Sequence, residues 1–244
     1  MTVLLPEADA TVLARRAEIV AVLRRLVSAD AVIDDVARMR PYESDALTAY
    51  RQLPLVVVLP ETTLQVAAVL RWCHENGVRV VPRGAGTSLS GGALPLGDAV
   101  LLVLSKFSRI LEIDIEDRLA VVQSGVANLA ISAAAEPHGL YYAPDPSSQI
   151  ACSIGGNVAE NSGGVHCLKY GLTTHNVLGV RLVTMEGEIV DLGGRAFDSS
   201  GLDLLGVVVG SEGLLGVVTE VTVRLLPKPE SVRALLIGFP TVDD

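Results

Sequence analysis

Residues 82–92 read Pro-Arg-Gly-Ala-Gly-Thr-Ser-Leu-Ser-Gly-Gly, and a short valine-rich run, Val-Arg-Val-Val at 78–81, comes directly before them. The run is typical of a buried β-strand, so the glycines are expected to turn the chain sharply where that strand ends. The N–H groups of such a turn can point into one concavity, and Thr87, Ser88 and Ser90 add hydroxyl donors. The pattern suits a pyrophosphate, although an ordinary glycine-rich turn would have the same composition.

Two better-known phosphate-binding loops do not fit this stretch. The dinucleotide fingerprint GxGxxG needs its last glycine where this sequence has Leu89, and glycines and a proline within 91–97 break the helix that should follow. The lysine of a P-loop is absent from 82–92. A nicotinamide Rossmann site is therefore disfavoured, and a P-loop is excluded.

A βαβ unit is expected to lead into the glycine-rich stretch. The β-branched run 55–59 predicts its first strand, and 78–81 predicts its second. Thr62 and Gln65 fit a capping box that opens the helix between them, and Gly77 fits the position that ends this helix.

The rest of the chain predicts many short strands and a few helices. An amphipathic helix is expected over 11–28, with Ile19, Val22, Leu23 and Leu26 on one face, and a shorter helix over 126–136. The mixed segment 32–54 predicts a connection with short strands. Further strands are expected at 99–104, 109–115, 119–123, 177–185, 188–191, 207–209, 217–226 and 232–239.

Two more glycine-rich segments stand out. The first lies within an expected irregular segment over 141–164, and it contains Pro144-Asp145-Pro146-Ser147-Ser148 followed by glycine pairs at 155–156 and 163–164. Glycine pairs let a backbone approach a ligand closely, and the apolar residues between them argue against a flexible surface loop. The second, GSEGLLG at 210–216, leads directly into a strand and by itself predicts only a turn.

Composition narrows the function further. Half of the 244 residues are hydrophobic, which is enough for the core of one large domain or of two small lobes. A net charge of −9 without a run of Lys or Arg disfavours nucleic acid and anionic membranes as partners, so a phosphate ligand would be held by backbone N–H groups. The apolar runs are too short to span a bilayer, and the N-terminus lacks the basic region of a signal peptide.

The cysteines and histidines give no sign of a disulfide framework or a metal site. There are three cysteines without a CxxC pair, which favours a reducing cytoplasm. The four histidines have no metal-ligand spacing. His166 follows the glycine pair at 163–164 and could face a ligand there, although a packing role explains it equally well.

Taken together, the three glycine-rich motifs resemble the FAD-binding domain of the vanillyl-alcohol oxidase and p-cresol methylhydroxylase superfamily of FAD-linked oxidases. Within it, the sequence most resembles the glycolate oxidase flavin subunits and the FAD-linked D-lactate dehydrogenases. The resemblance covers nearly the whole chain and is strongest over 54–229. It implies an α+β fold with two lobes, a small sheet with the βαβ unit and a mostly antiparallel sheet with helices.

The resemblance also divides the chain and assigns roles to its motifs. It implies an N-terminal helix at 1–29, a first lobe at 30–108, a second lobe at 109–228 and the start of a cap domain at 229–244. The first motif would wrap the pyrophosphate, the second would lie along the pyrophosphate, ribityl and isoalloxazine, and the third would frame the adenosine. The residues implied in FAD binding are Pro82, Arg83, Gly84, Ala85, Gly86, Thr87, Ser88, Pro144, Asp145, Ser148, Gly155, Gly156, Asn157, Gly163, Gly164, Glu212, Gly213 and Val218.

The activity implied is oxidation of a short 2-hydroxy acid, glycolate or D-lactate, with hydride passing to flavin N5. Some members attach FAD through a histidine in the first loop, but 82–92 contains none, so FAD is expected to be non-covalent. Other oxidase subunits, including an iron–sulfur subunit, are implied as partners.

The last residues, 240–244, predict the first turn of a helix, so the sequence is expected to be a fragment whose catalytic residues lie beyond 244. Two alternatives stay open: a non-catalytic FAD-binding module and, less favoured, a nicotinamide-binding protein.

Overall fold

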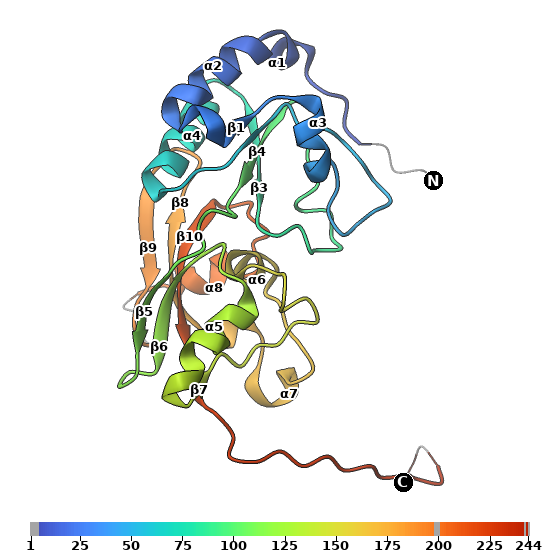
Figure 1. The fold of residues 1–244 in the computed structure, drawn as a ribbon, viewed down its shortest axis with the longest axis vertical. Coiled ribbons are helices and arrows are strands. Elements are labelled where there is room, and N and C mark those ends of the chain that lie inside the picture. Colours follow the sequence, from blue (N-terminus) through green and yellow to red (C-terminus); the bar gives the residue numbers. More distant parts are fainter. Residues whose placement is uncertain (1–4, 198–200, 242, 244) are drawn as a thin grey trace.

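The computed structural model describes residues 5–197, 201–241 and 243, and it divides into two lobes, each built on its own sheet (Figure 1). The first sheet has the order β1-β2-β4-β3, in which β2 and β3 run parallel to β4 on either side of it and β1 is antiparallel to β2. Its strands are β1 (Val32–Ile33), β2 (Val56–Val58), β3 (Arg79–Arg83) and β4 (Ala99–Val103).

The second sheet is antiparallel throughout and has the order β5-β6-β10-β8-β9. Its strands are β5 (Ile110–Asp114), β6 (Leu119–Gln123), β8 (Val177–Val183), β9 (Ile189–Gly193) and β10 (Val217–Arg224). A two-stranded ribbon joins β7 (Leu140–Tyr141) to β11 (Leu226–Pro227). The α+β class and the division into a parallel-containing and an antiparallel sheet are therefore confirmed.

Helices cover both sheets. In the first lobe these are α1 (Ala10–Ala14), α2 (Arg16–Leu26), α3 (Val36–Met39) and α4 (Thr63–Glu75). In the second lobe they are α5 (Asn128–Ala135), α6 (Ile154–Glu160), α7 (Cys167–Tyr170) and α8 (Leu204–Val208). Short 3₁₀ turns lie at Ala29–Ala31, Arg40–Tyr42, Glu136–His138 and Thr173–His175.

The core of each lobe forms where helices cover a sheet face. In the first lobe, Leu23 of α2 and Leu70 of α4 are fully buried against Val56 and Leu102 of the sheet. In the second, Ile131 of α5, together with side chains of α6 and α8, packs on one face of the antiparallel sheet. Because α5 and α6 share this core, the loops that flank them are held in fixed positions.

The predicted βαβ unit is present, and its helix begins as the sequence indicates. The Thr62 hydroxyl accepts a hydrogen bond from Gln65 N at 3.2 Å, and the Gln65 side chain accepts one from Glu61 N at 2.7 Å. Gly77 ends the helix with a φ of +64°, in the left-handed region that favours glycine. The two parallel strands of the unit are separated by β4 instead of being direct neighbours.

Four expected elements differ in the structure. The helix over 11–28 is two helices that meet at Arg15, and 207–209 ends helix α8, whose N-cap is Asp203, instead of forming a strand. The segment 141–164 contains α6, which the glycine pair at 155–156 concealed because glycine is rarely helical. No strand pairing involves 232–239 in the described chain, since this exposed segment runs away from both lobes (Figure 1).

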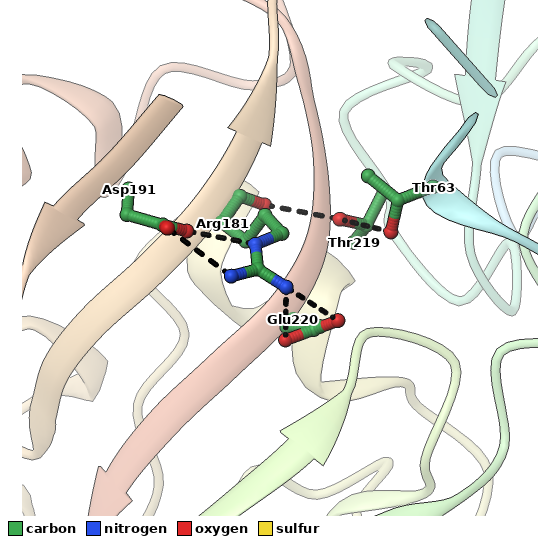
Figure 2. A network of polar contacts seen from close by, with 5 residues as sticks. All are labelled: Thr63, Arg181, Asp191, Thr219 and Glu220. Carbon is green, nitrogen blue, oxygen red and sulfur yellow. Dashed lines mark hydrogen bonds and ion pairs between the residues drawn. The ribbon is translucent and has the colours of Figure 1, made fainter. Parts of the chain in front are cut away.

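Close contacts fix the two lobes against each other. The Thr63 hydroxyl of α4 donates a hydrogen bond to the Thr219 hydroxyl of β10 at 3.2 Å, and the Thr219 hydroxyl donates to Arg181 O at 3.4 Å (Figure 2). The Arg181 guanidinium lies between Asp191 of β9 at 2.8 Å and Glu220 of β10 at 3.1 Å, so it links the three strands at this junction (Figure 2). These carboxylates raise the pKa of Arg181.

Candidate functional site

A cavity of about 460 Å³ brings the three glycine-rich motifs together, although they are far apart in the sequence. Its volume lies within the range of small-molecule and cofactor sites, roughly 300–1,000 Å³. The predicted residues that line it are Pro82, Arg83, Gly84, Ala85, Gly86, Thr87, Ser88, Ser148, Gly155, Gly156, Asn157, Gly163, Glu212, Gly213 and Val218. Pro144, Asp145 and Gly164 are absent from its lining.

The first motif turns sharply at the end of β3, and its residues line the cavity. Gly86 has a φ of +69°, and its carbonyl accepts a hydrogen bond from Ala46 N at 3.0 Å, which fixes the turn from behind. The N–H groups of residues 85–88 have no hydrogen-bond partner within the described chain. These residues line the cavity, so the loop offers a group of open donors to an anion.

The Arg83 side chain is committed to the loop itself. It is buried, and its Nη1 donates to Ser44 O at 2.8 Å and to Ala93 O at 3.3 Å, while the guanidinium lies 6.0 Å from the ring centre of Tyr42. Burial lowers the pKa of Arg83, and the neighbouring Asp45 and Tyr42 oppose that shift. The guanidinium thus closes the loop and connects it to the segment around 44.

Helix α6 forms the opposite wall of the cavity, and its first N–H groups are already paired. Ser153 caps the helix by accepting from Gly156 N at 3.3 Å, and Gly155 N donates to Ser124 O at 2.7 Å. A Cβ at Gly84 would collide with the Ser153 hydroxyl, and one at Gly155 would lie 2.7 Å from Ser124 Cβ. The glycines here therefore permit close approach of backbones.

The third motif joins α6 to the first loop. Gly210 N donates to Val158 O at 2.8 Å, and Glu212 N donates to Ala159 O at 2.9 Å. Glu212 has a φ of +54°, and a Cβ at Gly213 would lie 2.9 Å from Pro82 Cγ. The turn at 210–216 consequently contacts both α6 and the first loop, so the three glycine-rich segments surround the cavity.

The charges around the cavity are mostly negative. Its ionisable lining residues are Arg83, Glu160 and Glu212. Glu160 accepts a hydrogen bond from the Ser90 hydroxyl at 3.3 Å, which links α6 to the first loop. The Arg83 guanidinium is already bound to Ser44 O and Ala93 O. An anionic ligand would therefore depend on the open N–H groups of 85–88, as the overall acidity of the chain predicts.

Two of the three predicted residues outside the lining, Asp145 and Gly164, pack against each other. Gly164 lies directly against Asp145, so closely that a Cβ would collide with the carbonyl and carboxylate of Asp145. The Asp145 carboxylate also holds His166, whose Nδ1 lies 2.5 Å from Oδ2. His166 is therefore paired with Asp145 in an exposed position, and it is absent from the lining of the cavity.

Some lining residues were not among the predicted binding residues. They include Leu104, Ser124, Ser153, Val208, Ser211 and Gly216. Ser153 carries one signal, since serine is a favoured N-cap residue, but the glycine pair two residues later concealed the helix that it caps. Leu104 and Ser124 carry no such signal, since only the packing of the lobes brings them to the cavity.

The described part of the chain contains no group of three or more His, Cys, Asp or Glu residues that could hold a metal ion. Cys73, Cys152 and Cys167 are free thiols. Burial raises the pKa of Cys73 to about 12, so this thiol stays protonated and unreactive at neutral pH. No described helix has the length and apolar composition needed to cross a bilayer.

Comparison with known proteins identifies the family. A family model described as "FAD binding domain" matches residues 54–193, which is more than half of the chain. This chain belongs to the FAD-binding domain family. Its cofactor is FAD, and the matched region contains the first two glycine-rich motifs that line the cavity.

Similar proteins agree with this assignment. The chain is 56% identical over 239 residues to the glycolate oxidase subunit GlcD of Escherichia coli strain K12, an alignment that covers 98% of this chain and 47% of that protein. It is 39% identical over 223 residues to a D-lactate dehydrogenase of Anaerostipes hadrus, covering 91% of this chain and 46% of the relative. The chain thus spans about half the length of the curated relatives it matches.

A solved structure supports the fold. Alkyldihydroxyacetonephosphate synthase matches with a TM-score of 0.77 at 23% identity, covering 88% of this chain and 44% of that one. At this identity the likeness concerns the fold alone, and it agrees with the FAD-binding architecture of two lobes.

Proposed function

We propose that the cavity between the lobes is the FAD site and that the chain is the FAD-binding half of an oxidoreductase acting on a short 2-hydroxy acid, glycolate or D-lactate. The observation that carries the proposal is the group of unpartnered N–H groups at 85–88, because these residues line a cavity whose other ionisable residues are two glutamates and a paired arginine. These donors would hold the pyrophosphate of FAD. Bound FAD supplies the two-electron chemistry that such an oxidation requires.

The remaining walls of the cavity would each contact a different part of FAD. The segment around Ser148 and the glycines 155, 156 and 163 would lie along the ribityl chain and the flavin, and the turn 212–218 would lie at the adenosine end. Pro144, Asp145 and Gly164 would act indirectly by shaping the segment beside the cavity. In this assignment, 30–108 and 109–228 are the two halves of the FAD domain, 1–29 is a helical extension and 229–244 begins the next domain.

The test of FAD binding is direct. Purified protein is incubated with FAD, desalted, and examined by visible absorbance, and flavin bands near ~450 nm are expected to remain with the protein. NAD, incubated in the same way and then assayed enzymatically in the desalted protein, is expected to be lost. Retention of NAD with loss of FAD would contradict the proposal.

FAD is expected to dissociate without proteolysis. The described lining of the cavity contains no His, Cys or Tyr that could form a covalent bond to the flavin, and 82–92 has no histidine. Acid precipitation is therefore expected to release all the flavin into the supernatant. Flavin absorbance remaining on the washed, denatured polypeptide would show that the expectation is wrong.

The chain by itself is expected to oxidise glycolate and D-lactate very slowly, even with FAD bound. A carboxylate substrate needs a cationic partner, yet Arg83, the one cationic residue in the described lining, is bound to Ser44 O and Ala93 O. Anaerobic bleaching of the flavin by each acid is the measurement, with dithionite as the control for a reducible flavin. Rapid bleaching would place the substrate-binding groups within this chain, with His166 and Lys169 the first residues to mutate.

Slow turnover would also suit the second candidate function, a non-catalytic FAD-binding module, which the acidic lining favours. A chain extended to the full length of the GlcD relatives distinguishes the two, because only an enzyme gains turnover on extension.

We further propose a cytoplasmic location, since the three cysteines are free. We also propose a complex with other oxidase subunits, including an iron–sulfur subunit, by analogy with the glycolate oxidase subunits.

A further inference from the structure

Two buried asparagines form an amide pair behind the cavity. Asn128 is the first residue of α5 and is 1% exposed, and Asn157 lies in α6 and is 2% exposed. Asn157 Nδ2 lies 2.8 Å from Asn128 Oδ1. Asn157 lines the cavity, whereas Asn128 does not, so Asn128 touches the site only through its neighbours.

The partners of Asn128 determine which way both amides point. Its Nδ2 lies 2.9 Å from the carbonyl oxygen of Pro144, and a carbonyl oxygen can only accept a hydrogen bond. The amide nitrogen of Asn128 must therefore face Pro144, which leaves Asn128 Oδ1 facing Asn157. Because that oxygen also only accepts, Asn157 must turn its own amide nitrogen toward it.

The consequence appears at the cavity. One of the two N–H groups of Asn157 Nδ2 is engaged in this way, and the Oδ1 of Asn157 has no hydrogen-bond partner within the described chain. An amide oxygen is an acceptor without a proton to donate. Asn157 therefore brings an unpaired acceptor to the lining of the cavity, whereas residues 85–88 bring unpaired donors.

We infer that Asn128 is a positioning residue that fixes Asn157 with its Oδ1 toward the cavity, where this oxygen accepts a hydrogen bond from an N–H or O–H of the flavin half of FAD. The inference rests on the proposed FAD site. The two donor classes available are the N3–H of the flavin ring and the hydroxyls of the ribityl chain. Either donor would lose this acceptor if the side-chain amide of Asn157 were flipped.

Asn128 also ties together the segments that the flavin half would touch. Its backbone N donates to Cys152 O at 3.0 Å, just before the N-cap of α6, and its side chain holds Pro144, which begins the segment leading to Ser148. A loss of Asn128 could thus act by loosening these segments alone. A useful experiment must separate that effect from the orientation of the Asn157 amide.

The experiment uses FAD and two analogues that each lack one donor: FAD methylated at flavin N3 and FAD without the 2′-hydroxyl of the ribityl chain. The wild-type chain is expected to bind one analogue about tenfold more weakly than FAD, the value of one hydrogen bond. In Asn157→Leu and in Asn128→Leu, this ratio of dissociation constants is expected to fall to about one, because the acceptor is no longer presented. Circular dichroism establishes that each variant is folded.

Two further variants separate orientation from loosening. Asn128→Asp keeps an oxygen that accepts from Asn157 Nδ2, so the roughly tenfold ratio should persist even if FAD binding weakens overall. Ser132→Ala, on the same helix, removes hydrogen bonds to the backbone of Tyr142 at 3.1 and 3.2 Å but does not touch Asn157, so its ratio should also persist. If Asn128→Leu does not fold, Asn128→Ala is measured in the same way.

The possible outcomes are distinct. The inference is overturned if the folded wild type binds FAD but both analogues equally well, or if Asn128→Leu keeps the wild-type ratio. It is also overturned if Ser132→Ala loses the ratio, because the effect would then follow from loosening of the segment. A wild type that binds no FAD would instead refute the proposed function.

Discussion

Gly86→Asp is expected to abolish FAD binding while leaving the fold largely intact. Gly86 has a φ of +69°, and a Cβ built there would lie 2.7 Å from Arg83 Cζ, so the guanidinium that closes the loop would have to move. The new carboxylate would also add a negative charge to the loop that is proposed to hold a pyrophosphate. Loss of one charge-assisted hydrogen bond costs roughly 1.5–3 kcal/mol, so the dissociation constant should rise by at least ~10-fold, and repulsion adds to this effect.

The chain provides a matched control at Gly77. Its φ is +64°, nearly the same backbone conformation, but nothing lies within 4 Å of a Cβ built there. Gly77→Asp therefore carries a similar backbone strain without touching Arg83 or the cavity. Flavin retention and circular dichroism are measured for both variants. Wild-type flavin retention in folded Gly86→Asp, or an equal loss in Gly77→Asp, would refute the assignment of the pyrophosphate to this loop.

Gly125→Ala is expected to destabilise the whole chain and to weaken FAD binding with it. Gly125 lies where the two lobes meet, and its N donates to Phe107 O at 2.8 Å. An added Cβ would collide with Leu104 O and lie 2.8 Å from Phe107 O, and both are backbone atoms that a rotamer change cannot move. Forcing a methyl group into such a site costs typically up to about 3 kcal/mol. Because Leu104 and Ser124 on either side line the cavity, the shift would also distort the FAD site.

Thermal unfolding measures this effect, and a loss of about 3 kcal/mol corresponds to a melting temperature lower by roughly 6–12 °C in a chain of this size. Gly194→Ala is the control, because nothing lies within 4 Å of its added Cβ and its φ is not in the left-handed region. It should change the melting temperature very little. A melting temperature for Gly125→Ala within 2 °C of the wild type, on the scale of about 0.5 kcal/mol, would show that the junction can relax.

Much of the fold could be predicted from the sequence because its signals are local. The capping box at Thr62 and Gln65, the glycine after α4 and the β-branched runs each depend on neighbours a few residues away. The errors arose where local signals conflict with packing. The glycine pair at 155–156 indicates a loop, but the close contact with Ser124 requires glycine inside helix α6.

The sequence by itself determined the chemistry of the candidate site. The glycines of 82–92 permit a turn with open N–H groups, the lack of a histidine there disfavours covalent FAD, and the net charge of −9 leaves backbone donors as the means of holding a phosphate. These properties follow from residue type and from spacing over a few positions, and folding does not alter them.

Only the tertiary structure decided which atoms face the cavity. The pairing of Arg83 with Ser44 O joins residues 39 positions apart, and the pairing of Asn128 with Asn157 joins residues 29 positions apart. Such pairs form because buried polar groups must find partners wherever the packing of sheets and helices places them. For that reason the sequence could not indicate that the Arg83 guanidinium binds within its own loop, or that Asn128 pairs with Asn157 behind the cavity.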